Sequence, residues 1–182
     1  MKRIAVIGAG GAGKTRLARA LGQALDLPVV HLDAHYYGPR WQPLQPDRWA
    51  ERQRRLAAAD GWVMDGNYAG TLALRLERAD TVVFLDLPPL VCAWQVVRRW
   101  ALGRLAPAPD LPAGLRPKLD RRFLTYVLTF RRRRPALLAE LARRGPGVAL
   151  VTLSSRRAVR RFLKDAAAPA HRPGRPGTGR RR

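Results

Sequence analysis

The chain is poor in cysteine and in long apolar runs. Cys92 is the single cysteine among 182 residues, and a lone thiol can form neither an intrachain disulfide nor a cysteine-rich zinc site. The apolar run that starts at Ile4 is interrupted by glycines and then by Lys14, so it is too short for a secretory signal. No other run reaches the length of about 18 apolar residues that a membrane-spanning helix needs. We therefore expect a soluble, cytoplasmic protein in which Cys92 is a small buried hydrophobe.

Acidic residues are scarce as well. The sequence holds 13 acidic and 35 basic residues, which gives a formal net charge of +22. Such an excess of positive charge is typical of proteins that bind nucleic acid, phosphorylated substrates or an anionic surface. Nearly all of the basic residues are arginine, however, and a genome-wide coding bias would produce the same excess without any binding function. Both interpretations stay open at this level.

Short apolar runs alternate with longer amphipathic segments along most of the chain. The runs expected to be strands are 2–7, 28–32, 62–64, 81–85 and 148–153. The segments expected to be helices are 14–25, 46–59, 72–78, 88–102, 121–143 (kinked or divided at Pro135) and 155–164. This alternation predicts an α/β fold with a parallel sheet covered on both faces. Ligands of such sheets bind at the carboxyl ends of the strands.

The chain divides into a folded body and a tail. Residues 1–165 carry the alternating pattern, and 47% of the whole sequence is hydrophobic, which is enough for a packed core. Residues 166–182 are rich in alanine, proline, glycine and arginine, contain no acid and show no apolar periodicity. We expect one domain followed by a disordered basic tail.

A glycine-rich motif follows the first expected strand and opens the first expected helix. It matches the pattern G-x-x-x-x-G-K-[ST] of a phosphate-binding P-loop and consists of Gly8, Ala9, Gly10, Gly11, Ala12, Gly13, Lys14 and Thr15. Small residues let successive backbone N–H groups point at phosphate oxygens, and the helix N-terminus adds its positive dipole end. We expect Lys14 to bridge the β- and γ-phosphates of ATP and the Thr15 hydroxyl to bind Mg²⁺.

The same glycines allow a competing interpretation. Gly8, Gly10 and Gly13 also match G-x-G-x-x-G, and Asp33 lies about 20 residues on, where a dinucleotide-binding fold keeps its ribose-binding acid. A lysine and a threonine directly after the last glycine are needed for a P-loop and not for NAD binding. The sequence therefore favours a nucleoside triphosphate, with an NAD(P)-dependent enzyme as the less favoured alternative.

Three carboxylates follow expected strands. Asp33, Asp65 and Asp86 each come at the end of an apolar run, and the carboxyl ends of parallel strands meet at one edge of a sheet. Asp65 is our candidate for the second magnesium ligand, acting through water. Asp33 is our candidate to accept a proton from the phosphoryl acceptor or to hold a metal-bound water. For each, a plain strand-end cap or ion pair is the alternative, and for Asp86 it is the favoured interpretation.

Two further segments resemble known families. Val63-Met64-Asp65-Gly66-Asn67-Tyr68 resembles the Asp-Gly-Phe-Pro-Arg stretch of adenylate kinases. His31-Leu32-Asp33-Ala34-His35-Tyr36-Tyr37, together with Trp41, is similar to the bacterial DNA topology modulation proteins, which are small P-loop proteins of the adenylate-kinase type. The resemblance covers about residues 1–165. It implies a three-layer α/β/α P-loop NTPase fold, with a five-stranded parallel sheet in the order 2-3-1-4-5 and a small helical lid.

One departure from the adenylate kinases concerns the acceptor. Those enzymes grip a nucleoside monophosphate with an arginine after Asp-Gly-Phe-Pro, whereas this chain has Asn67-Tyr68-Ala69. The departure argues against a nucleoside monophosphate as acceptor. An aromatic stretch follows the second expected strand and consists of His35, Tyr36, Tyr37 and Trp41. Two interpretations of it stay open: these residues line an acceptor pocket, or they form an ordinary packed patch.

The resemblance also implies a mobile lid whose arginines close over the phosphates. The corresponding stretch is about 98–122, and within it Arg99 and Arg104 look like the lid-hinge arginines of the family, with catalytic roles. The alternative is a solvated basic face. For the run 131–134, a solvated face or a nucleic-acid contact is as well supported as a catalytic role.

These features support three functions. The leading hypothesis is an ATP- and Mg²⁺-dependent phosphotransferase that acts on a small-molecule acceptor. The second is a nucleotide-regulated DNA-binding protein in which the arginines contact duplex phosphates. The third is the NAD(P)-dependent enzyme.

Overall fold

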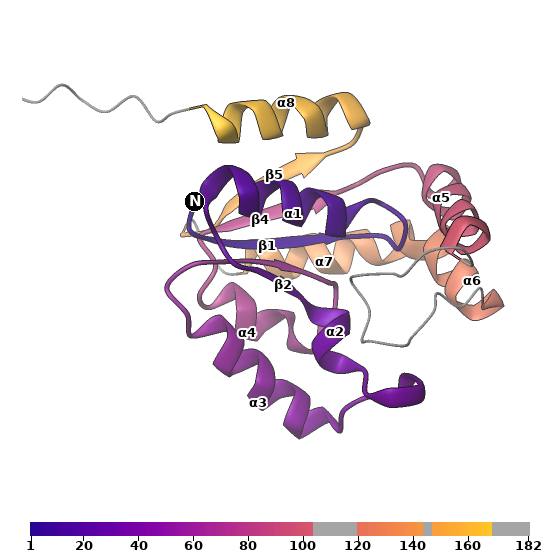
Figure 1. Ribbon diagram of the computed structural model, residues 1–182, viewed down its shortest axis with the longest axis horizontal. Helices are drawn as coiled ribbons and strands as arrows, with labels where there is room; N and C mark the ends of the chain where they lie inside the picture. Colours follow the sequence, from indigo (N-terminus) through magenta and orange to yellow (C-terminus); the bar gives the residue numbers. More distant parts are fainter. Residues whose placement is uncertain (104–119, 144–146, 169–182) are drawn as a thin grey trace, which may run out of the picture.

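The computed structural model describes residues 1–103, 120–143 and 147–168 (Figure 1). Its strands form one parallel sheet in the order β2-β3-β1-β4-β5, which confirms the expected sheet and its order. The strands are β1 (Arg3–Gly8), β2 (Val29–His31), β3 (Trp62–Asp65), β4 (Thr81–Leu85) and β5 (Ala149–Leu153).

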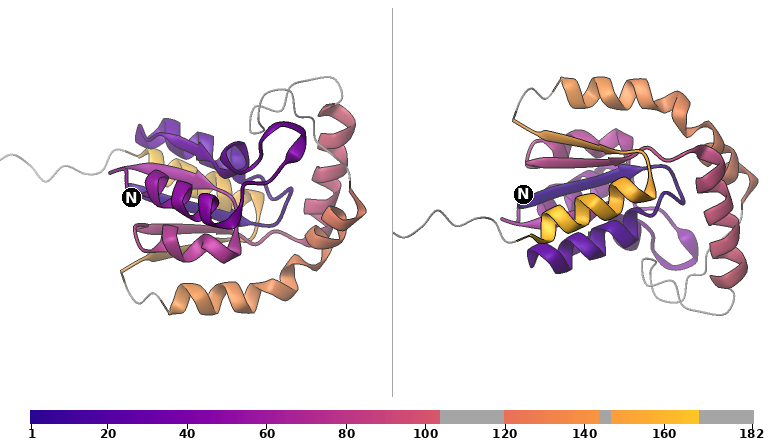
Figure 2. Two further views of the ribbon diagram at one scale, coloured as in Figure 1. Left: turned by 90° about the horizontal axis from the view of Figure 1, so that it is seen from below. Right: turned by 90° about the horizontal axis from the view of Figure 1, so that it is seen from above.

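Helices cover both faces of the sheet, so the fold has the three expected layers. The helices are α1 (Lys14–Leu25), α2 (Leu32–Tyr36), α3 (Pro46–Ala57), α4 (Leu72–Leu76), α5 (Pro89–Gly103), α6 (Arg121–Thr129), α7 (Arg134–Ala142) and α8 (Arg156–Ala167), with 3-10 turns η1 (Pro39–Trp41), η2 (Ala69–Thr71) and η3 (Phe130–Arg133). Figure 1 shows α1 and α8 on one face and α3, α4 and α7 on the other. Helices α5 and α6 lie across the carboxyl end of the sheet (Figure 2). No helix in the described ranges is long and apolar enough to span a membrane.

The central strand is the most buried part of the core. Ile4, Ala5, Val6 and Ile7 of β1 are fully buried, as expected for a parallel strand that is covered on both faces. The register aligns Val6 with Asp65 of β3 and His31 of β2 with the same Asp65. The polar ends of β2 and β3 therefore lie beside the end of β1, where the glycine-rich loop begins.

The sheet order is inconsistent with the dinucleotide-binding alternative. In that fold the second strand pairs directly with the first, whereas here β3 lies between β2 and β1. An acid that follows β2 is therefore displaced from the glycine-rich loop by the width of one strand. Of the two interpretations of Gly8–Thr15, the topology is therefore consistent with the P-loop and not with the dinucleotide-binding motif.

Most boundaries differ from the expected ones by one to three residues. The strand expected over 28–32 ends at His31, and Leu32 begins the short helix α2. The segment 121–143 is divided beside Pro135, as expected, by η3, because proline has no N–H to donate and its ring crowds the preceding turn. Helix α8 runs to Ala167, two residues into the expected tail; the rest of that tail, 169–182, lies outside the described residues.

Candidate active site

The glycine-rich loop connects the end of β1 to the start of α1. Gly11 has φ +76° and Gly13 has φ +93°, a left-handed region that residues with a Cβ adopt only at a cost. A Cβ on Gly11 would also lie 2.3 Å from the Cys92 carbonyl oxygen of α5. Glycine is therefore required at Gly11 both by the backbone and by the close approach of α5. Cys92 itself is fully buried, as expected.

Lys14 folds back over the loop. Its Nζ donates to the carbonyl oxygens of Gly8 (3.0 Å) and Ala9 (2.9 Å). Burial lowers the pKa of the ammonium group, although the carboxylates of Asp33 and Asp65 act in the opposite direction. The ammonium group is therefore held against the loop backbone, where a bound polyphosphate would meet it.

Thr15 and Asp65 form the expected pair. The Thr15 Oγ1 donates to Asp65 Oδ2 at 2.7 Å, and Asp65 is 6% exposed. These two side chains come from α1 and β3, and they meet because β3 pairs with β1. The prediction that Thr15 and Asp65 share one site agrees with this geometry.

His31 was not recognised from the sequence as part of this site. Its Nδ1 lies 2.7 Å from Asp65 Oδ1, and Arg19 Nε donates to its Nε2 at 3.3 Å. Because Nε2 accepts, Nδ1 carries the proton and donates to Asp65. The signal that could have revealed this role is the position of His31 at the end of β2, since β2 and β3 end together.

Asp33 lies elsewhere than expected. It follows β2 by two residues, in the first turn of α2 and not at the end of a strand. Tyr68 donates its hydroxyl to Asp33 Oδ1 at 2.6 Å. Burial and the Asp33 carboxylate both raise the pKa of Tyr68 above its ordinary range, so this phenol stays protonated and remains a donor.

Asn67, where the adenylate kinases have a different residue, supports the P-loop. Its Oδ1 accepts from the Gly8 N–H (2.9 Å) and its Nδ2 donates to the Gly8 carbonyl (2.7 Å). The same Nδ2 donates to the Tyr126 hydroxyl of α6 at 2.8 Å. The side-chain amide thus pairs with both backbone groups of the first loop residue and links that residue to α6.

Arg75 is a second residue that the sequence analysis missed. Its side chain is fully buried and donates to the carbonyl oxygens of Gly66 and Asn67. Burial lowers its pKa to about 10, so the guanidinium group keeps its charge at neutral pH. It holds the segment after β3 in shape.

A cavity of about 540 Å³ joins these groups. Its lining residues are Gly10, Lys14, Thr15, Asp33, Tyr37, Trp41, Asp65, Gly66, Asn67, Tyr68, Val96, Arg99, Asp120, Phe123 and Tyr126. Six of the expected site residues therefore share one cavity: Gly10, Lys14, Thr15, Asp33, Asp65 and Arg99. Arg104 lies outside the described residues.

The aromatic stretch divides between the two expected interpretations. Tyr37 and Trp41 line the cavity, with ring centroids 5.0 Å apart. Tyr36 packs instead against Trp49 (5.0 Å) and Tyr68 (4.8 Å). One part of the stretch therefore faces the cavity while the other is a packed patch.

Asp86 forms an ion pair, which is the role that the sequence favoured for it. Two arginines of the basic run 131–134 also make contacts outside the cavity. Arg134 Nε lies 3.2 Å from Asp86 Oδ2, which joins α7 to the end of β4. Arg133 lies over the Tyr126 ring, 5.2 Å from its centroid. Neither Asp86 nor these two arginines line the cavity.

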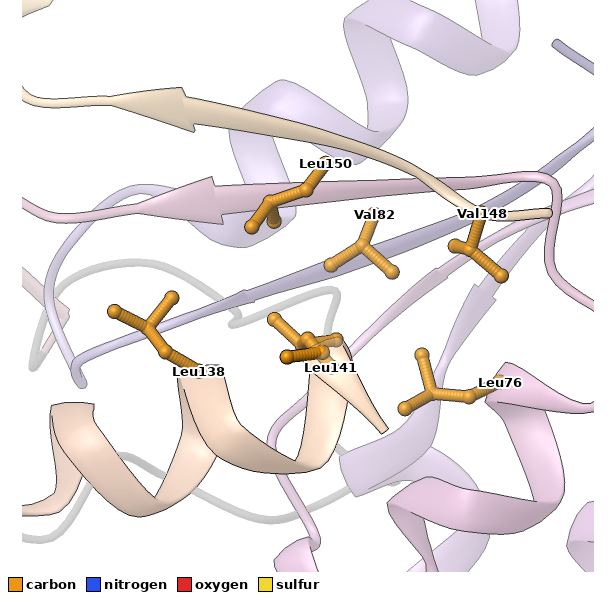
Figure 3. Close-up of a pocket in the computed structure, with 7 residues that line it drawn as sticks. Leu76, Val82, Leu138, Leu141, Val148 and Leu150 are labelled. Atoms are coloured by element: carbon orange, nitrogen blue, oxygen red, sulfur yellow. The ribbon is translucent and has the colours of Figure 1, made fainter. Parts of the chain in front are cut away.

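Two other cavities differ in character. One of about 560 Å³ lies on the face of α5 opposite the P-loop and is lined by Leu87, Pro88, Leu90, Val91, Trp94, Ser154, Ser155 and Arg156. The other, of about 230 Å³, lies between α7 and the sheet, and the side chains that line it are all apolar (Figure 3). With no titratable group among its lining residues, the second is not a candidate for chemistry.

No protein-family model matches the chain, and no curated protein matches it in sequence. Solved structures do match. A shikimate kinase from Bacteroides thetaiotaomicron is 17% identical, with 90% of this chain and 95% of that chain covered and a TM-score of 0.56. A gluconokinase from Sinorhizobium meliloti 1021 is 19% identical, with 92% and 90% covered and a TM-score of 0.53.

A shikimate kinase from Acinetobacter baumannii, solved in complex with shikimate, is 15% identical, with 91% and 90% covered and a TM-score of 0.54. At such identities the likeness establishes the fold. The chain has the α/β fold of the P-loop kinases, with the sheet order expected from its sequence.

Proposed function

We propose that the protein is an ATP-dependent phosphotransferase that moves the γ-phosphoryl group of ATP to a hydroxyl group of a small molecule. The observation that carries the proposal is the cavity that Lys14, Thr15, Asp65 and Asp33 line together. The first three are residue types that bind polyphosphate and magnesium. The fourth, Asp33, is a carboxylate able to take a proton from a hydroxyl group.

Thr15 and Asp65 are the residues that we propose for Mg²⁺. Their hydroxyl and carboxylate oxygens, 2.7 Å apart, are hard donors of the kind that Mg²⁺ prefers. When bound, the ion would neutralise charge on the β- and γ-phosphates. Through its Nδ1–H, His31 keeps the Asp65 carboxylate in one orientation, which is the usual role of an outer-shell partner.

Asp33 is the proposed base. In the transfer step the acceptor hydroxyl gives its proton to the Asp33 carboxylate while its oxygen forms a bond to the γ-phosphorus. The bond from that phosphorus to the bridging oxygen breaks, and ADP leaves. Tyr68 holds the base in place by donating to its Oδ1, so the reacting groups are positioned before the reaction begins.

Lys14 and Arg99 are the proposed cations at the transferred group. Both line the cavity, and Arg99 is close enough to contribute to the lowered pKa of Lys14. Positive groups at this position stabilise charge that develops on the phosphoryl oxygens. We assign Arg104 to the same role, as a lid residue, from the family resemblance alone.

The cavity on the other face of α5 is the proposed site of the nucleotide base. Cys92 and Val96 of α5 contact the P-loop at Gly11, so a nucleotide that leaves the loop meets α5 next. Beyond it, Trp94 is 57% exposed and lines a cavity with Ser154 and other residues after β5. An indole face beside hydroxyl groups is suited to a purine ring.

Calorimetry with Mg·ATP and labelled-ATP assays with a panel of hydroxyl compounds test this proposal. We expect magnesium-dependent binding of ATP and phosphorylation of at least one compound. Magnesium should strengthen ATP binding less in the Asp65→Asn variant than in the wild type. The Asp86→Asn variant, altered outside the cavity, should match the wild type. Absence of magnesium-dependent ATP binding would refute the proposal.

A second candidate, a nucleotide-regulated DNA-binding protein, is favoured by one observation. Helix α8 carries Arg156, Arg157, Arg160 and Arg161 on an exposed surface, and such a row of cations suits duplex phosphates. Membership of the DNA topology modulation family would agree with this function. It requires DNA affinity that depends on ATP and falls linearly with log salt; DNA affinity that is indifferent to nucleotide would count against it.

A further inference from the structure

Aromatic rings from segments outside the P-loop line part of the cavity. Tyr37 and Trp41 lie on the segment after α2, and Tyr68 follows β3. The Tyr68 ring packs on Trp49 (4.8 Å) on the side of the protein interior. Its hydroxyl reaches Asp33 at 2.6 Å. A carboxylate and three aromatic rings therefore surround the place that the proposed function gives to the acceptor.

Two of these rings are held by unusual backbone conformations. Trp41 has φ +62° and Tyr68 has φ +37°, in a region that bulky residues with a Cβ adopt only at a cost. Such conformations persist where the surrounding structure enforces them, and they gather at ligand sites. Among the four non-glycine residues of the described chain with positive φ, these two line the cavity.

The charge of the described cavity lining is opposite to that of the protein. Asp33 and Asp120 line the cavity, although the chain has only 13 acids and a net charge of +22. With Asp65, the described lining has three carboxylates and two cations, Lys14 and Arg99. An acceptor with its own carboxylate or phosphate would face two carboxylates. A neutral or cationic acceptor would gain from the carboxylates and from the ring faces.

We propose that the acceptor is a ring-bearing alcohol without an acidic group, bound with its ring against Trp41 and Tyr68 and its hydroxyl at Asp33. This inference rests on the proposed function and names its substrate class. The chemistry is shared by sugars, amino sugars and nucleosides. The acid forms of the same compounds are excluded.

Matched compounds test the exclusion of acids. Glucose and glucosamine are compared with glucuronate, and adenosine with AMP, by kcat/KM at saturating Mg·ATP. We expect the acid-free member of the preferred pair to lead by about tenfold or more. The Asp120→Asn variant keeps an N-cap side chain for α6 and should reduce this lead several-fold. Preference for the acid member, or phosphorylation of acyclic alcohols only, overturns the inference and leaves the kinase proposal standing.

A second pair of variants tests the ring contact. Trp41→Asn removes the indole and places a residue that tolerates positive φ; we expect KM for the acceptor to rise about tenfold with KM for ATP unchanged. Arg40→Asn is the matched control, because exposed Arg40 has φ +56° in the same turn. It should leave both KM values unchanged. An unchanged acceptor KM in Trp41→Asn overturns the inference.

Direct binding separates the two proposals. Tryptophan fluorescence of wild type and Trp41→Asn is titrated with glucosamine, glucuronate, adenosine and AMP in the absence of ATP. Quenching by an acid-free compound that requires Trp41 supports the inference even if Mg·ATP does not bind, in which case only the kinase proposal fails. Quenching by the acids alone, or by none of the compounds, overturns it.

Discussion

The two ends of the central cavity are built in different ways. The proposed phosphate end is one continuous segment, Gly8–Thr15, in which Lys14 Nζ donates to the carbonyl oxygens of Gly8 and Ala9. The proposed acceptor end is assembled from α2, the segment after it and the segment after β3. The first is contiguous in the sequence, although Asn67 and Asp65 brace it from outside, whereas the second exists only where several elements meet.

The largest effect is expected at the phosphate end. Lys14→Ala should lower kcat by about 10³-fold, equivalent to about 4 kcal/mol, because it removes a charge that stabilises the transferred phosphoryl group. Steady-state kinetics with the preferred acceptor measure this. Lys2→Ala, an exposed lysine outside the cavity, is the control. If Lys14→Ala kept wild-type turnover, the phosphate end would not be where we place it.

Arg75 tests how far the acceptor end depends on buried support. Arg75→Met should lower the free energy of unfolding by about 3 kcal/mol, since it leaves the carbonyl oxygens of Gly66 and Asn67 without their buried donor. Urea denaturation measures the change, and exposed Arg78→Met is the control. Equal stability of the two variants would show that the loop after β3 holds its shape without the guanidinium group.

His31 tests whether the phosphate end also has remote support. His31→Gln should lower activity about tenfold at limiting magnesium and raise the Mg²⁺ concentration needed for half-maximal rate, because Asp65 loses its oriented partner. A magnesium titration of the rate measures this, with His35→Gln, outside the cavity lining, as control. If the Mg²⁺ concentration at half-maximal rate were unchanged, His31 would not act on the magnesium site through Asp65.

The smallest effect is expected at Asp80, which lies at the amino ends of the strands, and not at the carboxyl ends where the cavity lies. Asp80 accepts from Thr81 Oγ1 (2.7 Å) and from the backbone N–H groups of Arg3 (3.0 Å) and Lys2 (2.7 Å). Burial alone would raise the pKa of Asp80, but these hydrogen bonds bring it below the ordinary value of 3.8. Its stabilisation is therefore present above that value and is lost as the pH falls through the lowered pKa.

Asp80→Asn should accordingly reduce the free energy of unfolding by about 1 kcal/mol at pH 7, with KM values unchanged. The difference from wild type should shrink as the pH falls below about 4. Urea denaturation at several pH values measures both, and exposed Asp60→Asn is the control. A deficit that stayed constant down to pH 2 would contradict the role given to the carboxylate.

The fold and the position of the glycine-rich loop could be predicted because their signals are local. Buried parallel strands appear as apolar runs, and the loop Gly8–Thr15 is eight consecutive residues of restricted type. Asp65 was found from its place after a strand. The helix α2 was missed because a five-residue helix shows too little periodicity to be distinguished from the end of a strand.

What the sequence determined by itself is the sheet and its glycine-rich loop. Only the tertiary structure decided the partners that orient these groups: His31 lies 34 positions from Asp65, and Asn67 lies 59 from Gly8. It also decided which aromatic residues face the cavity. The reason is physical, since a hydrogen bond between distant residues leaves no pattern along the chain and forms only when the sheet brings its strand ends together.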